Sequence, residues 1–193
     1  MEKRIITISR EFGSGGRYIG ECVAQRLGYT YYDKKLIEKI AEETGLSQKF
    51  IEKTGEYAPS KNIFAYSFVG RDRNGMAVED YLNNMQSKII HEIAEEGPCV
   101  IVGRCADDIL QDRTDCAHVF IHGDMPAKVK RIMELYNLSE NEAKKRMREM
   151  DKRRRIHYNY FTNGEWGAMR NYTITLNSSM LGIEKCIDII CGL

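Results

Sequence analysis

Three glycines lie close together near the start of the chain, at Gly13, Gly15 and Gly16, between a run of β-branched residues and an amphipathic segment. Glycine allows tight turns that aim backbone N–H groups at one point, and a helix that begins there adds unpaired N–H groups and the positive end of its dipole. Such a loop suits an anion, above all a phosphate. The sequence therefore predicts phosphate binding by Gly13, Ser14, Gly15, Gly16, Arg17 and Tyr18.

This loop differs from the common phosphate-loop pattern G-x-x-x-x-G-K-[ST], because Gly16 stands at the lysine position and Arg17 and Tyr18 follow it. A dinucleotide-binding loop is the nearest alternative, since Asp33 lies about twenty residues downstream, where a ribose-binding acid belongs. Tyr18, however, occupies the third glycine position of G-x-G-x-x-G, and a dehydrogenase has no need of the basic run described next. The loop thus indicates a nucleotide and leaves catalysis open.

A basic run over residues 144–155 contains eight basic and two acidic residues, a net charge of +6 in a chain whose formal charge is only +1. The small overall charge argues against binding of bulk nucleic acid. The run itself is either a solvated helix face or a phosphate-binding segment. We place a lid-like segment over residues 148–167 and an acceptor-binding insertion over the less regular residues 45–90.

Length and composition predict one globular domain, because 193 residues with 42% hydrophobic content are enough for a single core. Six scattered cysteines without C-x-x-C pairs predict buried thiols in a reducing compartment rather than disulfides or zinc ligands. We see no signal peptide and no apolar run of the roughly 20 residues that a membrane helix needs. We therefore expect a cytoplasmic protein with no membrane partner and leave its oligomeric state open.

Strand-like and helix-like segments alternate along the chain, which predicts an α/β fold. Short apolar runs predict strands over residues 4–9, 29–32, 99–102, 117–121 and 172–176. Amphipathic spacing predicts helices over residues 19–27, 34–44, 77–96 and 127–136, another from Ser139, where Glu142 completes a capping box, and a last one through Ile183, Ile187 and Ile190. These elements predict a three-layer domain with a mostly parallel five-stranded sheet.

Ligands of such sheets bind beyond the carboxyl ends of the strands. The glycine loop, Asp33, the pair Gly103 and Arg104, and the basic run should all reach this edge, where they would assemble a polyanion site. Phosphoryl transfer needs such a site, because its catalysis is mostly positioning and charge neutralisation. Arginine suits the task, since its planar fork holds phosphate oxygens bidentately.

The ordered motifs resemble those of cytidylate kinases and, more closely, of the cytidylate kinase-like group of P-loop proteins. The resemblance spans nearly the whole chain and depends on SREFGSGGRYIG, YYDKKLI, VIVGRCADDIL, EMDKRRR and TLNSSMLGIEKCIDII. It implies a P-loop NTPase-type fold that uses ATP and Mg²⁺. It further implies that Asp33 and Lys39 lie on the acceptor side, that Arg104 contacts the acceptor phosphate, and that Arg153 and Arg155 are lid arginines.

The chain departs from cytidylate kinases at charged positions. Those enzymes have lysine at Gly16, aspartates at Val102 and Cys105, and serine at Lys34. We hypothesise that Arg17 replaces the missing lysine and that Asp107 or Asp108 holds magnesium through water, while the metal ligands themselves remain unknown.

Several other side chains have both a functional and a packing interpretation. Cys105 lies near positive charge that would lower its thiol pKa, or it is a small apolar filler. His157 and Tyr158 contact a base or phosphate, or they pack. Trp166 lies in a turn of the lid-like segment. Four aromatic residues line an acceptor-base pocket or belong to the core: Tyr57, Phe64, Tyr66 and Phe68.

The leading interpretation is a phosphotransferase that moves the γ-phosphate of ATP to a nucleoside monophosphate or another small phosphorylated or hydroxylated acceptor. Its catalytic candidates are Arg17, Arg104, Arg153 and Arg155. The alternative is a nucleotide-binding regulatory or interaction protein that keeps the fold but has lost efficient transfer along with the loop lysine.

Overall fold

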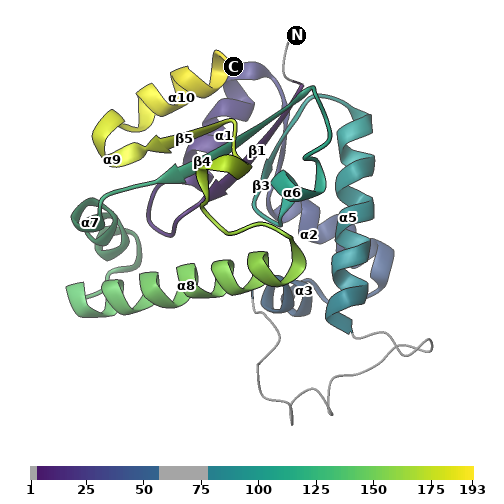
Figure 1. Ribbon diagram of the computed structural model, residues 1–193. Coiled ribbons are helices and arrows are strands. Elements are labelled where there is room, and N and C mark those ends of the chain that lie inside the picture. Colours follow the sequence, from purple (N-terminus) through teal and green to yellow (C-terminus); the bar gives the residue numbers. More distant parts are fainter. Residues whose placement is uncertain (1–3, 57–77) are drawn as a thin grey trace.

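A five-stranded, all-parallel sheet forms the centre of the computed structural model, which describes residues 4–56 and 78–193 (Figure 1). The strand order is β2-β3-β1-β4-β5. The strands are β1 (Ile5–Arg10), β2 (Thr30–Tyr32), β3 (Cys99–Val102), β4 (Cys116–His122) and β5 (Ile174–Asn177). The predicted α/β fold with five strands is confirmed. The four aromatic residues expected in an acceptor-base pocket, Tyr57 to Phe68, lie outside the described residues.

The centre of the sheet is apolar because its strands are covered on both faces. All four residues of β3 are buried, as the continuous run predicts, and Ile5 of β1 pairs in register with Cys99 of β3 and Cys116 of β4. Side chains along β1 alternate between the two faces. Ile5 packs into one core cluster, whereas Ile6 and Ile8 pack into the other.

Helices cover each face of the sheet. On one face α1 (Gly16–Leu27) and α10 (Ile183–Cys191) bury Val23 and Ile187 against the strands. The other face is covered by α2 (Lys34–Thr44), α3 (Gln48–Glu56), α5 (Val78–Glu96) and the short α6 (Ala106–Ile109). Two more short helices, η1 (Met169–Asn171) and α9 (Ser178–Leu181), flank β5. In the described ranges, no helix is both long and apolar enough to cross a membrane.

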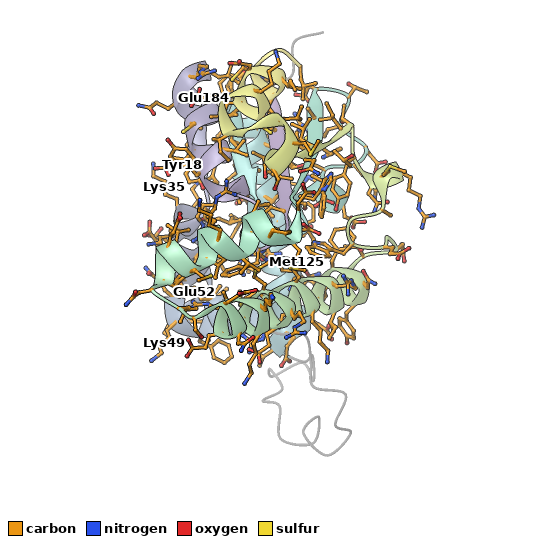
Figure 2. All side chains as sticks on the ribbon, turned by 90° about the vertical axis from the view of Figure 1, so that its left-hand side faces the viewer. Tyr18, Lys35, Lys49, Glu52, Met125 and Glu184 are labelled. Atoms are coloured by element: carbon orange, nitrogen blue, oxygen red, sulfur yellow. The ribbon has the colours of Figure 1, made fainter. Side chains whose placement is uncertain are left out.

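Two further helices pack on each other at the carboxyl end of the strands. Helix α7 (Met125–Tyr136) buries Val129 and Ile132, and α8 (Glu140–Phe161) buries Ala143 and Met147 against them. Figure 2 shows the two helices side by side, with Met125 marking the start of α7. In Figure 1, α8 lies across the end of the sheet. Most of the predicted lid-like segment is therefore part of one 22-residue helix.

Candidate functional site

The glycine loop between β1 and α1 turns sharply at two glycines that have left-handed backbone. Gly13 and Gly15 both have φ of +83°. Gly15 is the N-cap of α1 and makes no side-chain capping bond, while its carbonyl accepts from the Ile19 N–H at 2.9 Å. The amides in the first turn of a helix have no acceptor inside that helix. Those of α1, from Gly16 onward, are thus oriented to receive an anion.

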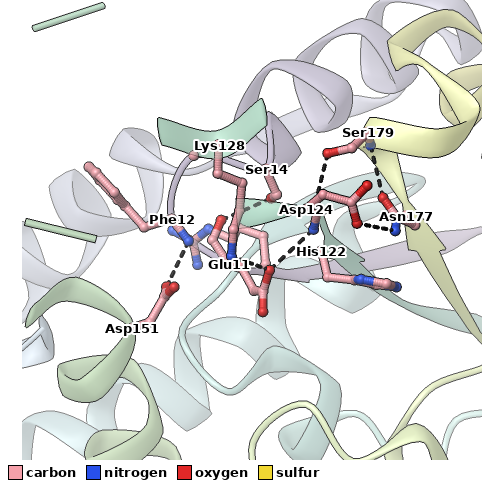
Figure 3. A network of polar contacts seen from close by, with 12 residues as sticks. Glu11, Phe12, Ser14, His122, Asp124, Lys128, Asp151, Asn177 and Ser179 are labelled. Carbon is pink, nitrogen blue, oxygen red and sulfur yellow. Dashed lines mark hydrogen bonds and ion pairs between the residues drawn. The ribbon is translucent and has the colours of Figure 1, made fainter. Parts of the chain in front are cut away.

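Buried polar contacts hold this loop in place (Figure 3). The Glu11 carboxylate accepts from Lys128 Nζ at 2.7 Å and from the Gly123 N–H at 3.1 Å. Ser14 is fully buried, and its hydroxyl donates to the Glu11 carbonyl at 2.9 Å. The Ser178 hydroxyl in turn donates to the Ser14 carbonyl at 2.6 Å. The Ser14 side chain therefore supports the loop, and its carbonyl joins the loop to α9.

Helix α8 is joined to the same loop. The Phe12 N–H donates to Asp151 Oδ1 at 2.7 Å, and Arg154 Nη1 donates to the Arg10 carbonyl at 3.1 Å. From α7, Arg131 donates to the Gly13 carbonyl at 2.8 Å. Two of these bonds use loop carbonyls, those of Arg10 and Gly13, and one uses the Phe12 amide, so helices α7 and α8 hold the loop from both kinds of backbone group.

Two cavities open beside the loop. The larger, of about 750 Å³, lies between the loop, α7 and α8, and its walls include Gly13, Gly15, Gly16, Tyr18, Tyr136 and Arg146. The smaller, of about 260 Å³, lies between the end of β2, the end of β3 and α8, and its walls include Asp33, Lys34, Gly103, Arg104, His157 and Trp166. Three arginines line both cavities: Arg10, Arg17 and Arg154. Three basic side chains thus lie where the two cavities meet.

Arg17 and Asp33 form an ion pair, with Arg17 Nε 2.7 Å from Asp33 Oδ2. Asp33 precedes α2, as predicted, but its side chain makes no capping hydrogen bond. An aspartate directly before a helix commonly caps the first turn, but here the carboxylate turns to Arg17 instead. The pair links the start of α1 to the start of α2 at the edge of the smaller cavity.

Arg104 lies in the sharp turn after β3, with a positive φ of 60°. Its carbonyl accepts from Gln86 Nε2 at 2.9 Å, which fixes the turn against α5. Arg104 lines the smaller cavity together with Asp33.

Four of the predicted site residues line neither of these cavities, and Ser14, whose side chain is buried in the loop, is one of them. Lys39 lies on α2 and pairs with Glu96 at 2.6 Å, near the amino end of β3. Arg153 borders a shallow hollow along α8 instead. The Arg155 guanidinium lies 5.6 Å from the ring centre of Trp166 and so reaches the smaller cavity only through that ring.

Comparison with known proteins identifies the family and the fold of this chain. Residues 5–180 match the sequence profile of the cytidylate kinase-like family. The chain belongs to this family. No curated protein gives a significant match to the sequence. Among solved structures, an uncharacterized protein from Eubacterium ventriosum superposes with a TM-score of 0.74 at 28% identity, covering 97% of this chain and 96% of that one.

Shikimate kinases share the fold. The enzyme from Bacteroides thetaiotaomicron superposes with a TM-score of 0.51 at 16% identity, covering 96% of this chain and 95% of that one. The enzyme from Acinetobacter baumannii, solved in complex with shikimate, gives 0.53 at 12% identity, covering 96% and 89%. These values establish a common P-loop kinase architecture.

Asp107 and Asp108, which the sequence suggested as magnesium ligands through water, lie on α6. Asp107 is only 3% exposed and accepts from the Ser9 hydroxyl at 3.1 Å and the Tyr158 hydroxyl at 2.9 Å. Burial raises the pKa of Asp107, and also that of Asp108. Among residues 4–56 and 78–193, no three metal-ligating side chains gather into a site. The described side chains therefore do not form a built magnesium site, and the Asp107 carboxylate accepts hydrogen bonds from Ser9 and Tyr158.

Cys105 and His157 form a buried pair, with Cys105 Sγ 3.6 Å from His157 Nδ1. Burial raises the pKa of the Cys105 thiol well above its ordinary value, and burial lowers the pKa of His157 to about 4. The expectation of a lowered thiol pKa is wrong, because burial outweighs the effect of the nearby Arg104. A neutral thiol beside a neutral imidazole fits packing rather than nucleophilic chemistry.

Sequence reasoning missed Arg10 and Arg154, the arginines that line both cavities with Arg17. Helical spacing could have found Arg154, because it follows the inward-facing Met147 by two turns. For Arg10 the signal was the phosphate-loop pattern itself, in which Arg10 occupies the first glycine position and Gly16 the lysine position.

Proposed function

We propose that the protein transfers the γ-phosphate of ATP to a nucleoside monophosphate or a similar small acceptor. The observation that carries this proposal is the meeting of two cavities at Arg10, Arg17 and Arg154, directly beside the glycine loop. Transfer between two anionic substrates needs both a site for each and concentrated positive charge between them. Family membership and the P-loop kinase fold support the same conclusion.

In this proposal the larger cavity holds the donor. Backbone amides from Gly13 to Arg17 bind its phosphates, and the smaller cavity places an acceptor near Arg104. The bond from the γ-phosphorus to its bridging oxygen breaks, and that electron pair leaves with ADP. An acceptor oxygen forms the new bond to phosphorus, and a hydroxyl acceptor releases its proton to water.

The arginines neutralise the charge that gathers on the transferring group. Mg²⁺ that arrives with ATP would neutralise further phosphate charge. No built carboxylate cluster among the described residues is available to hold the ion, so no step here depends on one.

A nucleotide-binding protein with weak or no transfer is the second candidate. Gly16 favours it, because the lysine usual at that position is absent. ATP consumption measured across nucleoside monophosphates, shikimate and small alcohols distinguishes the two candidates. Acceptor-dependent turnover supports the kinase, ATP binding without turnover supports the binding protein, and absence of both contradicts each of them.

Arg104 provides a test of which cavity serves which substrate. Arg104→Ala should raise KM for the acceptor at least tenfold, because a charge-assisted contact is lost, while the Kd for ATP stays within about twofold. Arg148→Ala is the matched control, since Arg148 is an exposed arginine on α8 that borders neither cavity. Equal acceptor KM in Arg104→Ala and the control would contradict the assignment.

A further inference from the structure

Compared with the phosphate-loop pattern, this chain has a long side chain at the position of the first glycine and a glycine at the position of the lysine. In G-x-x-x-x-G-K the first position is glycine and the last is lysine, whereas this chain has Arg10 first and Gly16 last. The two positions differ from the pattern together. Both differences have one explanation, which is that the two positions lie too close together for two side chains.

The side chains of these two positions would begin only 2.6 Å apart. A Cβ atom added to Gly16 would lie 2.6 Å from Arg10 Cβ, closer than such atoms approach, and 3.1 Å from Arg10 Cγ, which is a tight contact. Gly16 has helical backbone as the first residue of α1, so its conformation does not call for glycine. Glycine is needed at position 16 for lack of space, because the Arg10 side chain fills the place that a side chain there would occupy. Only one of the two positions can carry a long side chain.

The Arg10 guanidinium extends toward the turn after β3. An added Cβ at Gly103 would lie 3.0 Å from Arg10 Cζ, and Gly103 has φ of +75°. Glycine at position 103 thus leaves room for the guanidinium between the ends of β1 and β3. From there Arg10 lines both cavities, and the bond from Arg154 to its carbonyl fixes the backbone.

Arg17, the replacement expected from sequence, is placed differently. Its Nε lies 2.7 Å from Asp33 Oδ2, and 58% of its side chain is exposed. Part of its charge is therefore neutralised by Asp33. Arg10 starts deeper, at the end of a central strand, and its side chain begins beside the position from which a lysine side chain at residue 16 would start.

We propose that Arg10 supplies the cation that a phosphate loop ordinarily obtains from lysine at position 16. The proposal depends on the proposed function for its catalytic part. The Arg10 guanidinium binds oxygens of the ATP β- and γ-phosphates and stabilises the charge that develops as the γ-phosphoryl group leaves ADP for the acceptor.

Exchanging the two residues tests this role. Arg10→Gly should lower turnover on the order of 100-fold and weaken ATP binding at least tenfold, because one charge-assisted phosphate contact is lost. Gly16→Lys alone should fold poorly, because its side chain meets Arg10. The double variant Arg10→Gly/Gly16→Lys should regain a melting temperature near wild type and return turnover to within about tenfold of it. Arg148→Ala again controls for loss of one arginine.

The outcomes separate this proposal from the proposed function. If wild type consumes ATP with an acceptor, a folded Arg10→Gly protein within twofold of wild type overturns the role of Arg10. A folded double variant no more active than Arg10→Gly overturns the shared position. If wild type binds ATP without turnover, the kinase proposal fails, and titration with ATP then tests the role of Arg10. Tenfold weaker ATP binding by Arg10→Gly supports this role, and equal binding overturns it. Wild type that does not bind ATP overturns both.

Discussion

Gly15 combines a left-handed backbone with close neighbours. Its φ is +83°, and an added Cβ would lie 2.9 Å from Ile183 Cδ1 and 3.0 Å from Arg131 Nη1. Gly15→Val should therefore weaken ATP binding strongly, because both the turn and the approach of a phosphate are hindered. Gly28→Val is the matched control: Gly28 also has positive φ, +69°, but has no atom within 4 Å of an added Cβ and ends α1.

Calorimetric titration with ATP, together with circular dichroism to confirm folding, measures the effect. Gly28→Val should lose stability through backbone strain and keep the ATP affinity of wild type. If folded Gly15→Val binds ATP as well as this control does, the loop is not the phosphate site.

His157 makes stability depend on pH. Burial lowers the pKa of its imidazole to about 4, whereas an exposed histidine titrates near 6.5. Between these values the unfolded chain binds a proton that the folded protein excludes, so the free energy of unfolding decreases as the pH falls from 6.5 to 4. The shift corresponds to a loss of about 3 kcal/mol across this window.

Urea unfolding of wild type and His157→Gln at several pH values measures this contribution. The difference between the two proteins in unfolding free energy should shrink steadily below pH 6.5. His91→Gln, which removes an exposed imidazole from α5, serves as the control and should follow wild type. If the unfolding free energies of wild type and His157→Gln change with pH in parallel, His157 is not the group that causes the loss of stability at low pH.

Single residues also show where sequence reasoning stops. The glycine loop was predictable, because glycine, charge and the start of a helix coincide over six residues. The partner of Asp33 was not, because capping α2 and pairing with Arg17 are equally compatible with the sequence, and only the position of α1 beside β2 selects the pair. Lys39 likewise meets Glu96 only once α2 packs beside α5.

At the scale of elements, α8 is fixed to the sheet by one face. Asp151 accepts from Phe12, Arg154 donates to Arg10, and Tyr158 donates to the buried Asp107, all at one side of the helix. Three hydrogen bonds at spacings of three and four residues hold a helix whose exposed face is strongly basic. We expect ATP to strengthen this attachment by adding phosphates between α8 and the loop.

Hydrogen exchange with and without ATP tests the prediction over residues 149–167. Exchange of these amides should slow when ATP binds. Tyr158→Phe should speed their exchange without ligand, because it removes a hydrogen bond to a buried carboxyl group, at a cost on the order of 1–3 kcal/mol. Tyr160→Phe, a change at an exposed residue of the same helix, is the control. ATP binding without any protection in this segment would make the basic run a solvated face.

The sequence predicts where α8 begins, but it does not predict which face of this helix turns toward the cavities. Ser139 and Glu142 form the expected capping box, with the Ser139 N–H donating to Glu142 at 2.9 Å. Four consecutive basic residues at 152–155 point in different directions on a helix, so their roles depend on its phase. The resemblance favoured Arg153 and Arg155, whereas the structure turns Arg154 toward both cavities.

For the whole molecule, alternation of apolar strands and amphipathic helices was enough to predict the layers, because parallel strands need crossover helices and these cover both faces. It also predicted which edge of the sheet gathers the charged residues. It did not reveal that this edge divides into two cavities with a shared wall of arginines. That division depends on how α7 and α8 pack across the strand ends.

The shared wall leads to a prediction about ligands that fill both cavities. Adenosine joined to a second nucleoside through five phosphates should bind on the order of 100-fold more tightly than ATP, because one tethered molecule occupies both sites and meets Arg10, Arg17 and Arg154 together. A two-phosphate linker is the matched control, since it is too short to serve both sites. Calorimetry over a panel of second nucleosides measures the gain, which added salt should reduce because it screens the exposed part of this charge. If ATP binds but no pentaphosphate binds more tightly than ATP, the two cavities do not act as one site.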